Sequence, residues 1–469
     1  MNLEYIFLTD YVSETPFHKS HSELKSFLNK IEKQNKRLVN LEVIGKSPEG
    51  REIYCLELGN RYSENKILLV SNAHGEEVNG CEEILHIIKL LTENPDFKKT
   101  FLENYQFVVV PTVNPDAREY NLRWAKNMDL SKFFLDYKRT ITDKNNLKID
   151  LEWSYPFRDD TNIKRPELAA MIELMDSQKF DMFIDIHGAI GTYKSGFWYM
   201  IDETKGKKDK LVNFLYNLGK SSGLPLNAFD MGPLCPRLKP GVYGLLTAKR
   251  ILKELPHAED YLEQKGGVSS MDYFMRKNPE GQIICCELPT FYHEKYLDNT
   301  VSDKKELDIK KTLINHYIHL WKEKIIPLTE KALQIEPHPK LKAFREGIDK
   351  KEIVFLRDRL LELKEEEPYK KAEVGEVNCS EMSKYWLAPG YGQGGYVSDL
   401  FGEGLAGVIS ELPLESRIKL AEIYKICSTE SKKAAKNALA FGLKKFALAE
   451  SINIQGKACL GSILAYFTD

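Results

Sequence analysis

The sequence predicts an α/β fold, in which short buried strands alternate with amphipathic helices. Continuous apolar runs such as Ile67–Val70 are typical of strands that are covered on both faces. Apolar residues at helical spacing then follow, as from Val78 to Leu91. Glycine and polar residues separate the two kinds of segment, as at 71–75. Open α/β sheets place their chemistry at such turns, because the loop is exposed while the sheet holds it rigid.

Length and composition are those of an ordinary globular protein. The 469 residues exceed what one hydrophobic core usually serves, so we expect one large domain with a substantial addition, or two domains. A net charge of −2 gives no reason to expect nucleic acid or an anionic membrane as a partner. The first residues lack the features of a signal peptide, and no run approaches a membrane span. The 8 cysteines form no Cys-x-x-Cys pair, and free thiols favour a reducing, cytoplasmic location.

Further elements are expected on both sides of the turn at 71–75. Apolar residues on one face predict a helix over Ser22–Gln34. Residues 41–58 form two apolar segments around the turn Pro48-Glu49-Gly50 and predict a pair of strands. Beyond the helix that ends near Asn94, Tyr105–Pro111 predicts another strand, followed by a turn at 112–116.

His74 lies where the predicted strand 67–70 turns into a helix. Glu77 follows three residues later, and positions i and i+3 share a helix face whereas i+2 points away. This spacing favours Glu77 over Glu76 as the partner of His74. An imidazole and a carboxylate suit Zn²⁺, which in catalytic sites keeps an open position for water. The alternative is a surface histidine beside an acid that complements the helix dipole.

A second histidine has the same placement. An amphipathic helix at 166–175 leads to the apolar run 180–186, which predicts a strand that ends at His187 and Gly188. Together with Glu77, the two histidines form the His, Glu, His ligand set used by catalytic zinc hydrolases. The sequence therefore favours a site for one zinc ion over coincidental core or surface histidines.

A glutamate near the end of a later predicted strand, 281–290, supplies a candidate base. Glu287 is costly to bury without a partner, so it either faces water or belongs to a site. A zinc-dependent hydrolase needs a group that takes a proton from water. Glu411 stands in a similar Glu-Leu-Pro segment and competes for this role. The shorter distance from His187 favours Glu287 in a compact catalytic domain.

Over roughly residues 15 to 325, the sequence resembles the zinc metallocarboxypeptidases of the carboxypeptidase A type. The segments that carry the resemblance are Gly45-Lys46-Ser47-Pro48-Glu49-Gly50-Arg51, His74-Gly75-Glu76-Glu77, Asn114-Pro115-Asp116, Arg123, Pro166-Glu167, Asp185-Ile186-His187, Gly266-Gly267 with Asp272-Tyr273, and Cys286-Glu287-Leu288. The ordered set is far more specific than any one of these segments.

The resemblance implies a mixed, mostly parallel eight-stranded sheet flanked by helices, with zinc at the carboxyl ends of central strands. It assigns the metal to His74, Glu77 and His187. It makes Glu287 the general base and then the acid that protonates the leaving amine. Arg123 would stabilise the oxyanion, a role that its charge suits in any family.

The resemblance also assigns residues around the metal and the substrate. Asp129 would hydrogen-bond a zinc-bound histidine and fix its tautomer. Tyr261 would correspond to the mobile tyrosine that caps the substrate. Met271 falls near the position that lines the specificity pocket, which suggests an apolar terminal side chain.

One departure concerns the substrate. Where the family has Asp-x-Asn-Arg, whose last two residues grip the terminal carboxylate, this chain has Asp129-Leu130-Ser131-Lys132. Lys132 can hold a carboxylate only as a point charge, without the planar fork of arginine.

The sequence therefore predicts a catalytic domain at 1–335 and an additional α+β C-terminal region of unknown role at 336–469. We expect a hydrolase that uses zinc-activated water to remove a C-terminal amino acid from peptides. The alternatives are a zinc-dependent deacylase or amidohydrolase, which would take an acyl-amino acid, and a non-catalytic relative that binds peptides. The sequence does not indicate an oligomeric state.

Overall fold

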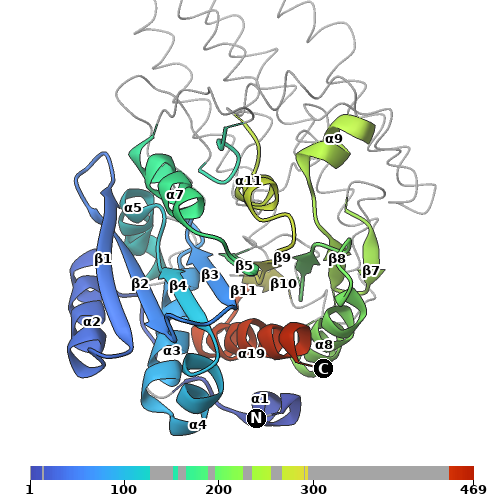
Figure 1. Ribbon diagram of the computed structural model, residues 1–469, viewed down its shortest axis with the longest axis horizontal. Helices are drawn as coiled ribbons and strands as arrows, with labels where there is room; N and C mark the ends of the chain where they lie inside the picture. Colours follow the sequence, from blue (N-terminus) through green and yellow to red (C-terminus); the bar gives the residue numbers. More distant parts are fainter. Residues whose placement is uncertain are drawn as a thin grey trace, which may run out of the picture.

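The protein is an α/β structure in which helices cover both faces of one large sheet (Figure 1). The computed structural model describes residues 2–12, 15–126, 151–156, 165–188, 196–224, 226, 235–254, 267–289, 291–293 and 443–468. The predicted fold class is confirmed. Within the described residues the sheet has nine strands, whereas the resemblance implied eight, and their order is β1-β2-β4-β3-β5-β9-β6-β8-β7.

The strands are short, and the predicted ones are present. Their bounds are β1 Val39–Lys46, β2 Glu52–Gly59, β3 Lys66–Ser71, β4 Gln106–Val110, β5 Met182–His187, β6 Tyr199–Ile201, β7 Arg237–Lys239, β8 Val242–Gly244 and β9 Gln282–Glu287. Two further strands, β10 Phe291–His293 and β11 Leu443–Lys445, form a separate antiparallel pair. The short strands β7 and β8 lie at one end of the sheet, and β7 forms its edge.

The helices lie between the strands in sequence. Their bounds are α1 Leu3–Leu8, α2 His21–Gln34, α3 Asn79–Glu93, α4 Pro95–Phe97, α5 Pro115–Ala125, α7 Pro166–Ser177, α8 Lys208–Ser221, α9 Ala248–Glu254, α11 Ser270–Lys277 and α19 Leu448–Phe467, with a π-helical turn at Lys98–Leu102. Ser20 caps α2 through a capping box with Glu23, as expected where serine precedes a helix by one position. None of the described helices is both long and apolar enough to cross a membrane.

The centre of the sheet is parallel and its flanks are mostly antiparallel. The pairs β4–β3, β3–β5 and β5–β9 are parallel, whereas β1–β2, β2–β4, β9–β6 and β8–β7 are antiparallel. Parallel neighbours end at the same edge of a sheet. The register pairs Ser71 with Ile186 and His187 with Glu287, so the carboxyl ends of β3, β5 and β9 meet there.

Alternate residues of the central strands enter two hydrophobic cores. In β3, Ile67 and Leu69 face the core formed with α3, α8 and α19, while Leu68 and Val70 face the core formed with α7 and α11. Because both faces are covered, every one of these side chains is buried and the strand is continuously apolar. The turn that carries His74 is therefore anchored on a rigid layer.

The last described helix returns to the core beside the sheet. Helix α19 packs against α3 and α8 and contributes Ile452, Leu460 and Ile463 to the first core (Figure 1). A Cβ atom on Gly461 would lie 2.1 Å from the Phe214 ring, so glycine permits the close approach of α19 to α8. The boundary predicted at 335/336 lies outside the described residues and stays a prediction, but the last helix belongs to the same core as the sheet.

Candidate metal centre

The turn after β3 is folded tightly against its own chain. Asn72 adopts a left-handed backbone conformation with φ of 54°, which asparagine tolerates better than most residues. Its side-chain amide donates to the carbonyl oxygen of Glu77 at 2.6 Å. This hydrogen bond joins the two ends of the turn and holds the segment that carries His74 between them.

Glycine is required at one position of this turn. A Cβ atom on Gly75 would lie 2.2 Å from the Cβ of Ala117 in α5 and 2.8 Å from the backbone nitrogen of Arg118. Neither atom can move away easily, because Ala117 and Arg118 are both fully buried. The turn can approach α5 only because residue 75 has no side chain.

The two predicted histidines meet at the carboxyl edge of the sheet. His74 and His187 are almost fully buried, and their ring centroids are 4.9 Å apart. Glu77 lies between them: Oε1 is 2.8 Å from Nδ1 of His74, and Oε2 is 3.1 Å from Nδ1 of His187. The backbone N–H of Gly188 also donates to Oε2. The structure thus brings the three predicted ligands together, and their inner atoms are two Nδ1 atoms and one carboxylate.

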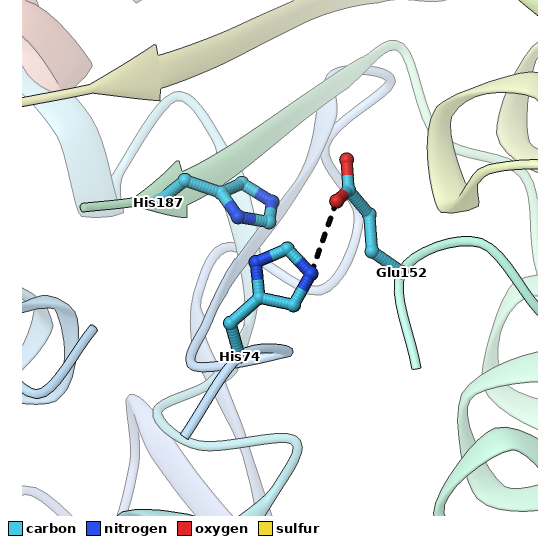
Figure 2. Close-up of side chains that lie close together, drawn as sticks. All are labelled: His74, Glu152 and His187. Atoms are coloured by element: carbon cyan, nitrogen blue, oxygen red, sulfur yellow. Dashed lines mark ion pairs between the residues drawn. The ribbon is translucent and has the colours of Figure 1, made fainter. Parts of the chain in front are cut away.

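The outer nitrogens of the two rings face other carboxylates. Nε2 of His74 is 3.1 Å from Oε2 of Glu152, the contact marked in Figure 2. Nε2 of His187 is 3.3 Å from Oδ1 of Asp185. Each imidazole therefore lies between Glu77 on its inner side and a different acid on its outer side.

A second grouping of ligand atoms competes with this one. Ligand atoms of His74, Glu152 and His187 also lie within 4.8 Å of one another. We favour the set with Glu77, because its carboxylate faces the same nitrogen type on both rings. Histidines that bind metals usually direct the other ring nitrogen at a carboxylate, which is the place that Glu152 and Asp185 occupy. The donor set of two imidazoles and one carboxylate fits zinc.

Electrostatics favour a cation at this point. Burial alone would raise the pKa of the Glu77 carboxyl, but the charges of His74 and His187 lower the pKa well below its ordinary value. Burial would likewise lower the pKa of His187, but Asp185, Glu152 and Glu77 raise the pKa well above its ordinary value. The acids around the histidines thus stabilise positive charge in a buried site.

The candidate base adjoins this centre. Glu287 ends β9 and pairs in register with His187 on β5, so the two side chains leave the same face of neighbouring strands. Burial raises the pKa of Glu287 to about 8, against the opposing charge of His187. A carboxylate with a pKa near neutrality is suited to exchange protons during catalysis.

The remaining predicted site residues are placed only in part. Arg123 is exposed on α5, where its guanidinium lies 3.5 Å from the centroid of the Tyr120 ring and its Nε donates to the Tyr120 carbonyl oxygen. Met271 is buried in the second core. Asp129, Ser131, Lys132, Tyr261 and Glu411 lie outside the described residues. Their roles, and that of Arg123 at the oxyanion, stay predictions.

Two acids of the site were not foreseen. Asp185 could have been found, because residues i and i+2 of a strand share a face and Asp185 precedes His187 by two positions. Glu152 gave a weaker signal. Asp150-Leu151 repeats the Asp-Leu of residues 129–130, so the motif assigned to 129–132 had a second possible location, which includes Glu152.

Comparison with known proteins finds a family match over part of the chain. Residues 24–217 match the peptidase M14 family of zinc carboxypeptidases. The predicted resemblance is confirmed. This family uses zinc and hydrolyses peptides. The matched zinc carboxypeptidase span includes His74, Glu77 and His187 and ends before Glu287.

Individual zinc carboxypeptidases are similar over part of the chain. Mouse carboxypeptidase M is 25% identical over 191 residues, which are 39% of this chain and 41% of that protein. Human carboxypeptidase D is 28% identical over 183 residues, 37% of this chain and 12% of that protein. The chain thus spans less than half the length of these relatives. The solved carboxypeptidase A of Helicoverpa armigera aligns with a TM-score of 0.40 and 15% identity over 61% of this chain and 70% of that one, a likeness too low to carry an argument.

Proposed function

We propose that this chain is a zinc-dependent hydrolase that removes a C-terminal amino acid from peptides. The observation that carries the proposal is the position of Glu77, whose two oxygens face Nδ1 of both buried histidines at 2.8 and 3.1 Å. A buried carboxylate between two imidazoles is the donor set of catalytic zinc hydrolases. The match of residues 24–217 to zinc carboxypeptidases supports the same reaction.

Each residue has a separate task in this proposal. His74, Glu77 and His187 hold the metal, and Gly188 helps to fix the Glu77 carboxylate through its backbone N–H. When bound, zinc supplies a Lewis acid that makes water a nucleophile near neutral pH. Glu287 would accept a proton from the attacking water and pass it to the leaving amine, an exchange that its raised pKa suits.

The substrate is expected to reach the metal with its terminal carboxylate held by Lys132 and Ser131, and with its carbonyl oxygen near Arg123. These assignments rest on the family resemblance. A peptide is the expected substrate, and no nucleic acid or membrane partner is expected.

The proposal is tested by zinc content together with hydrolysis. The purified full chain is incubated with a panel of N-blocked dipeptides and acyl-amino acids, with chelator and after zinc is returned. We expect release of a free C-terminal amino acid, which the chelator abolishes and zinc restores. Turnover of acyl-amino acids alone would indicate the deacylase, whereas stoichiometric zinc without turnover of any substrate would contradict the enzyme assignment.

The variant Glu287→Gln tests whether Glu287 is the general base. This variant keeps the size of the side chain but cannot accept a proton, so kcat should fall by roughly 10²- to 10⁴-fold while zinc content stays unchanged. The matched control is Glu280→Gln, since Glu280 is exposed in the turn before β9. Full turnover by Glu287→Gln would remove Glu287 from this role and make Glu411→Gln the next variant.

A further inference from the structure

Ser270 contacts both acids that lie behind the metal-binding histidines. It is the first residue of α11 and is buried. Its hydroxyl donates to Oδ2 of Asp185 at 3.0 Å, and its backbone N–H donates to the carbonyl oxygen of Glu152 at 2.8 Å. One residue thus joins two acids that come from strand β5 and from the segment 151–156.

The two acids in turn contact one histidine each. Oδ1 of Asp185 is 3.3 Å from Nε2 of His187, and Oε2 of Glu152 is 3.1 Å from Nε2 of His74. The negative charge of each acid favours a proton on the nearby Nε2, which leaves the lone pair on Nδ1, the atom that faces Glu77. Each acid therefore selects the tautomer in which the histidine can bind a cation from its inner side.

The segment around Ser270 is well fixed. Tyr155 and Val268 form a β-bridge through two backbone hydrogen bonds, which ties the segment 151–156 to the residues before α11. Ser269 caps α11 by accepting the N–H of Asp272, and both oxygens of Asp272 accept the N–H of Ala248. The β-bridge before Ser270 and the helix cap at Ser269 fix the position of Ser270. It can therefore hold the two acids in fixed positions relative to each other.

We propose that Ser270 is a positioning residue for the metal centre, and that it aligns His187 through the Asp185 carboxylate and His74 through the Glu152 backbone. This inference rests on the metal site of the proposed function, but it does not require that the chain hydrolyse peptides. It assigns a role in zinc affinity to three residues, Ser270, Asp185 and Glu152, none of which is among the predicted zinc ligands.

Zinc affinity of the full chain tests the proposal, measured by competition with a chromogenic chelator. Asp185→Asn and Glu152→Gln should each weaken zinc binding by roughly 10- to 100-fold, the usual effect of removing the partner of a metal-bound histidine. Ser270→Ala removes one hydrogen bond to a charged group and should weaken zinc binding by roughly three- to tenfold. The matched control is Ser451→Ala, a buried serine that donates to the buried carboxylate of Glu83. It should lower the melting temperature but leave zinc affinity unchanged.

Double variants distinguish the contact of Ser270 with Asp185 from its contact with Glu152. Alanine at 270 keeps the N–H that the Glu152 carbonyl accepts but loses the hydroxyl that binds Asp185. Ser270→Ala should therefore add no further loss in an Asp185→Asn background, whereas its effect should multiply that of Glu152→Gln. The opposite pattern, or zinc affinities that match the wild type in Asp185→Asn and Ser270→Ala, would overturn the inference. Absence of zinc binding in the wild type would instead overturn the proposed function.

Discussion

The two halves of the metal centre are built differently. In the His187 half, one strand supplies both the histidine and its outer acid, since Asp185 and His187 lie two positions apart on β5. In the His74 half, the histidine lies in a turn, and its outer acid, Glu152, comes from a segment 78 positions later in the sequence. The His187 half is therefore as rigid as the sheet, whereas the His74 half depends on how a turn and a distant segment pack together.

This difference determines where the centre is vulnerable. A change near β5 acts on a central strand of a sheet that is covered on both faces. A change in the turn at 72–77 acts on backbone that packs against α5 and that the hydrogen bond from Asn72 to Glu77 closes. We expect substitutions in the two halves to differ in their effects on stability, although both histidines are proposed to bind the same ion.

The largest expected effect concerns which nitrogen of each ring binds the metal. The amide oxygen of asparagine lies one bond beyond Cγ, as Nδ1 of histidine does, whereas that of glutamine reaches the position of Nε2. Because Nδ1 faces Glu77 on both rings, His74→Asn and His187→Asn should retain more zinc affinity than His74→Gln and His187→Gln. All four variants should bind zinc at least tenfold more weakly than the wild type.

Zinc titration with a competing chelator measures this order. If glutamine were better than asparagine at position 74 alone, the metal would lie on the Glu152 side of that ring. The two histidines would then bind the ion through different nitrogens. This result would contradict the proposal that both bind it through Nδ1, the atom that faces Glu77.

A smaller effect on zinc affinity is expected from Gly75→Ala in the His74 half. The new methyl group would overlap Ala117 and the backbone of Arg118 in α5, so the turn must shift. We expect a loss of about 3 kcal/mol in the free energy of unfolding, measured with urea, and a weaker zinc site. Gly206→Ala is the control, because nothing lies within 4 Å of the added atom. Equal stability of the two variants would show that the turn is not held by α5.

The smallest effect concerns α3, the helix that follows the His74 turn. Glu83 lies on the buried side of α3 and accepts a hydrogen bond from Ser451 of α19. Burial raises the pKa of Glu83 to about 7, from the ordinary 4.5. Between these values the folded state holds a proton that the unfolded state has released, so stability falls as pH rises.

Glu83→Gln removes this titration. The difference in unfolding free energy between wild type and variant should change by up to about 1.4 kcal/mol per pH unit between pH 5 and 7, in favour of the variant as pH rises. Urea unfolding at several pH values measures it. A difference that does not depend on pH would mean that Glu83 titrates alike in both states.

The same contrast explains what could be predicted from the sequence. His74, Glu77 and His187 were identifiable because each lies at the end of an apolar run, where strand periodicity and a glycine mark a turn. The signal for Asp185 was equally local, because this residue lies two positions before His187 in the same strand. Glu152 was not, because its contact with His74 depends on the bridge between Tyr155 and Val268, which no periodicity encodes.

The fold shows the same limit. The central strands and most helices could be predicted, since continuous apolar runs and helical spacing are local signals. The place of α19 in the first core could not, because its packing against α3 and α8 joins residues more than 200 positions apart. Long-range packing of this kind leaves no mark in a local pattern.

The central claim is that one zinc ion lies between Nδ1 of His74, Nδ1 of His187 and the carboxylate of Glu77. Anomalous diffraction at the zinc edge, from crystals of the zinc-loaded full chain, tests it most directly. The account predicts one anomalous peak about 2.0–2.2 Å from each of these three groups. A peak between Nε2 of His74 and Glu152, or none in this region, would contradict it.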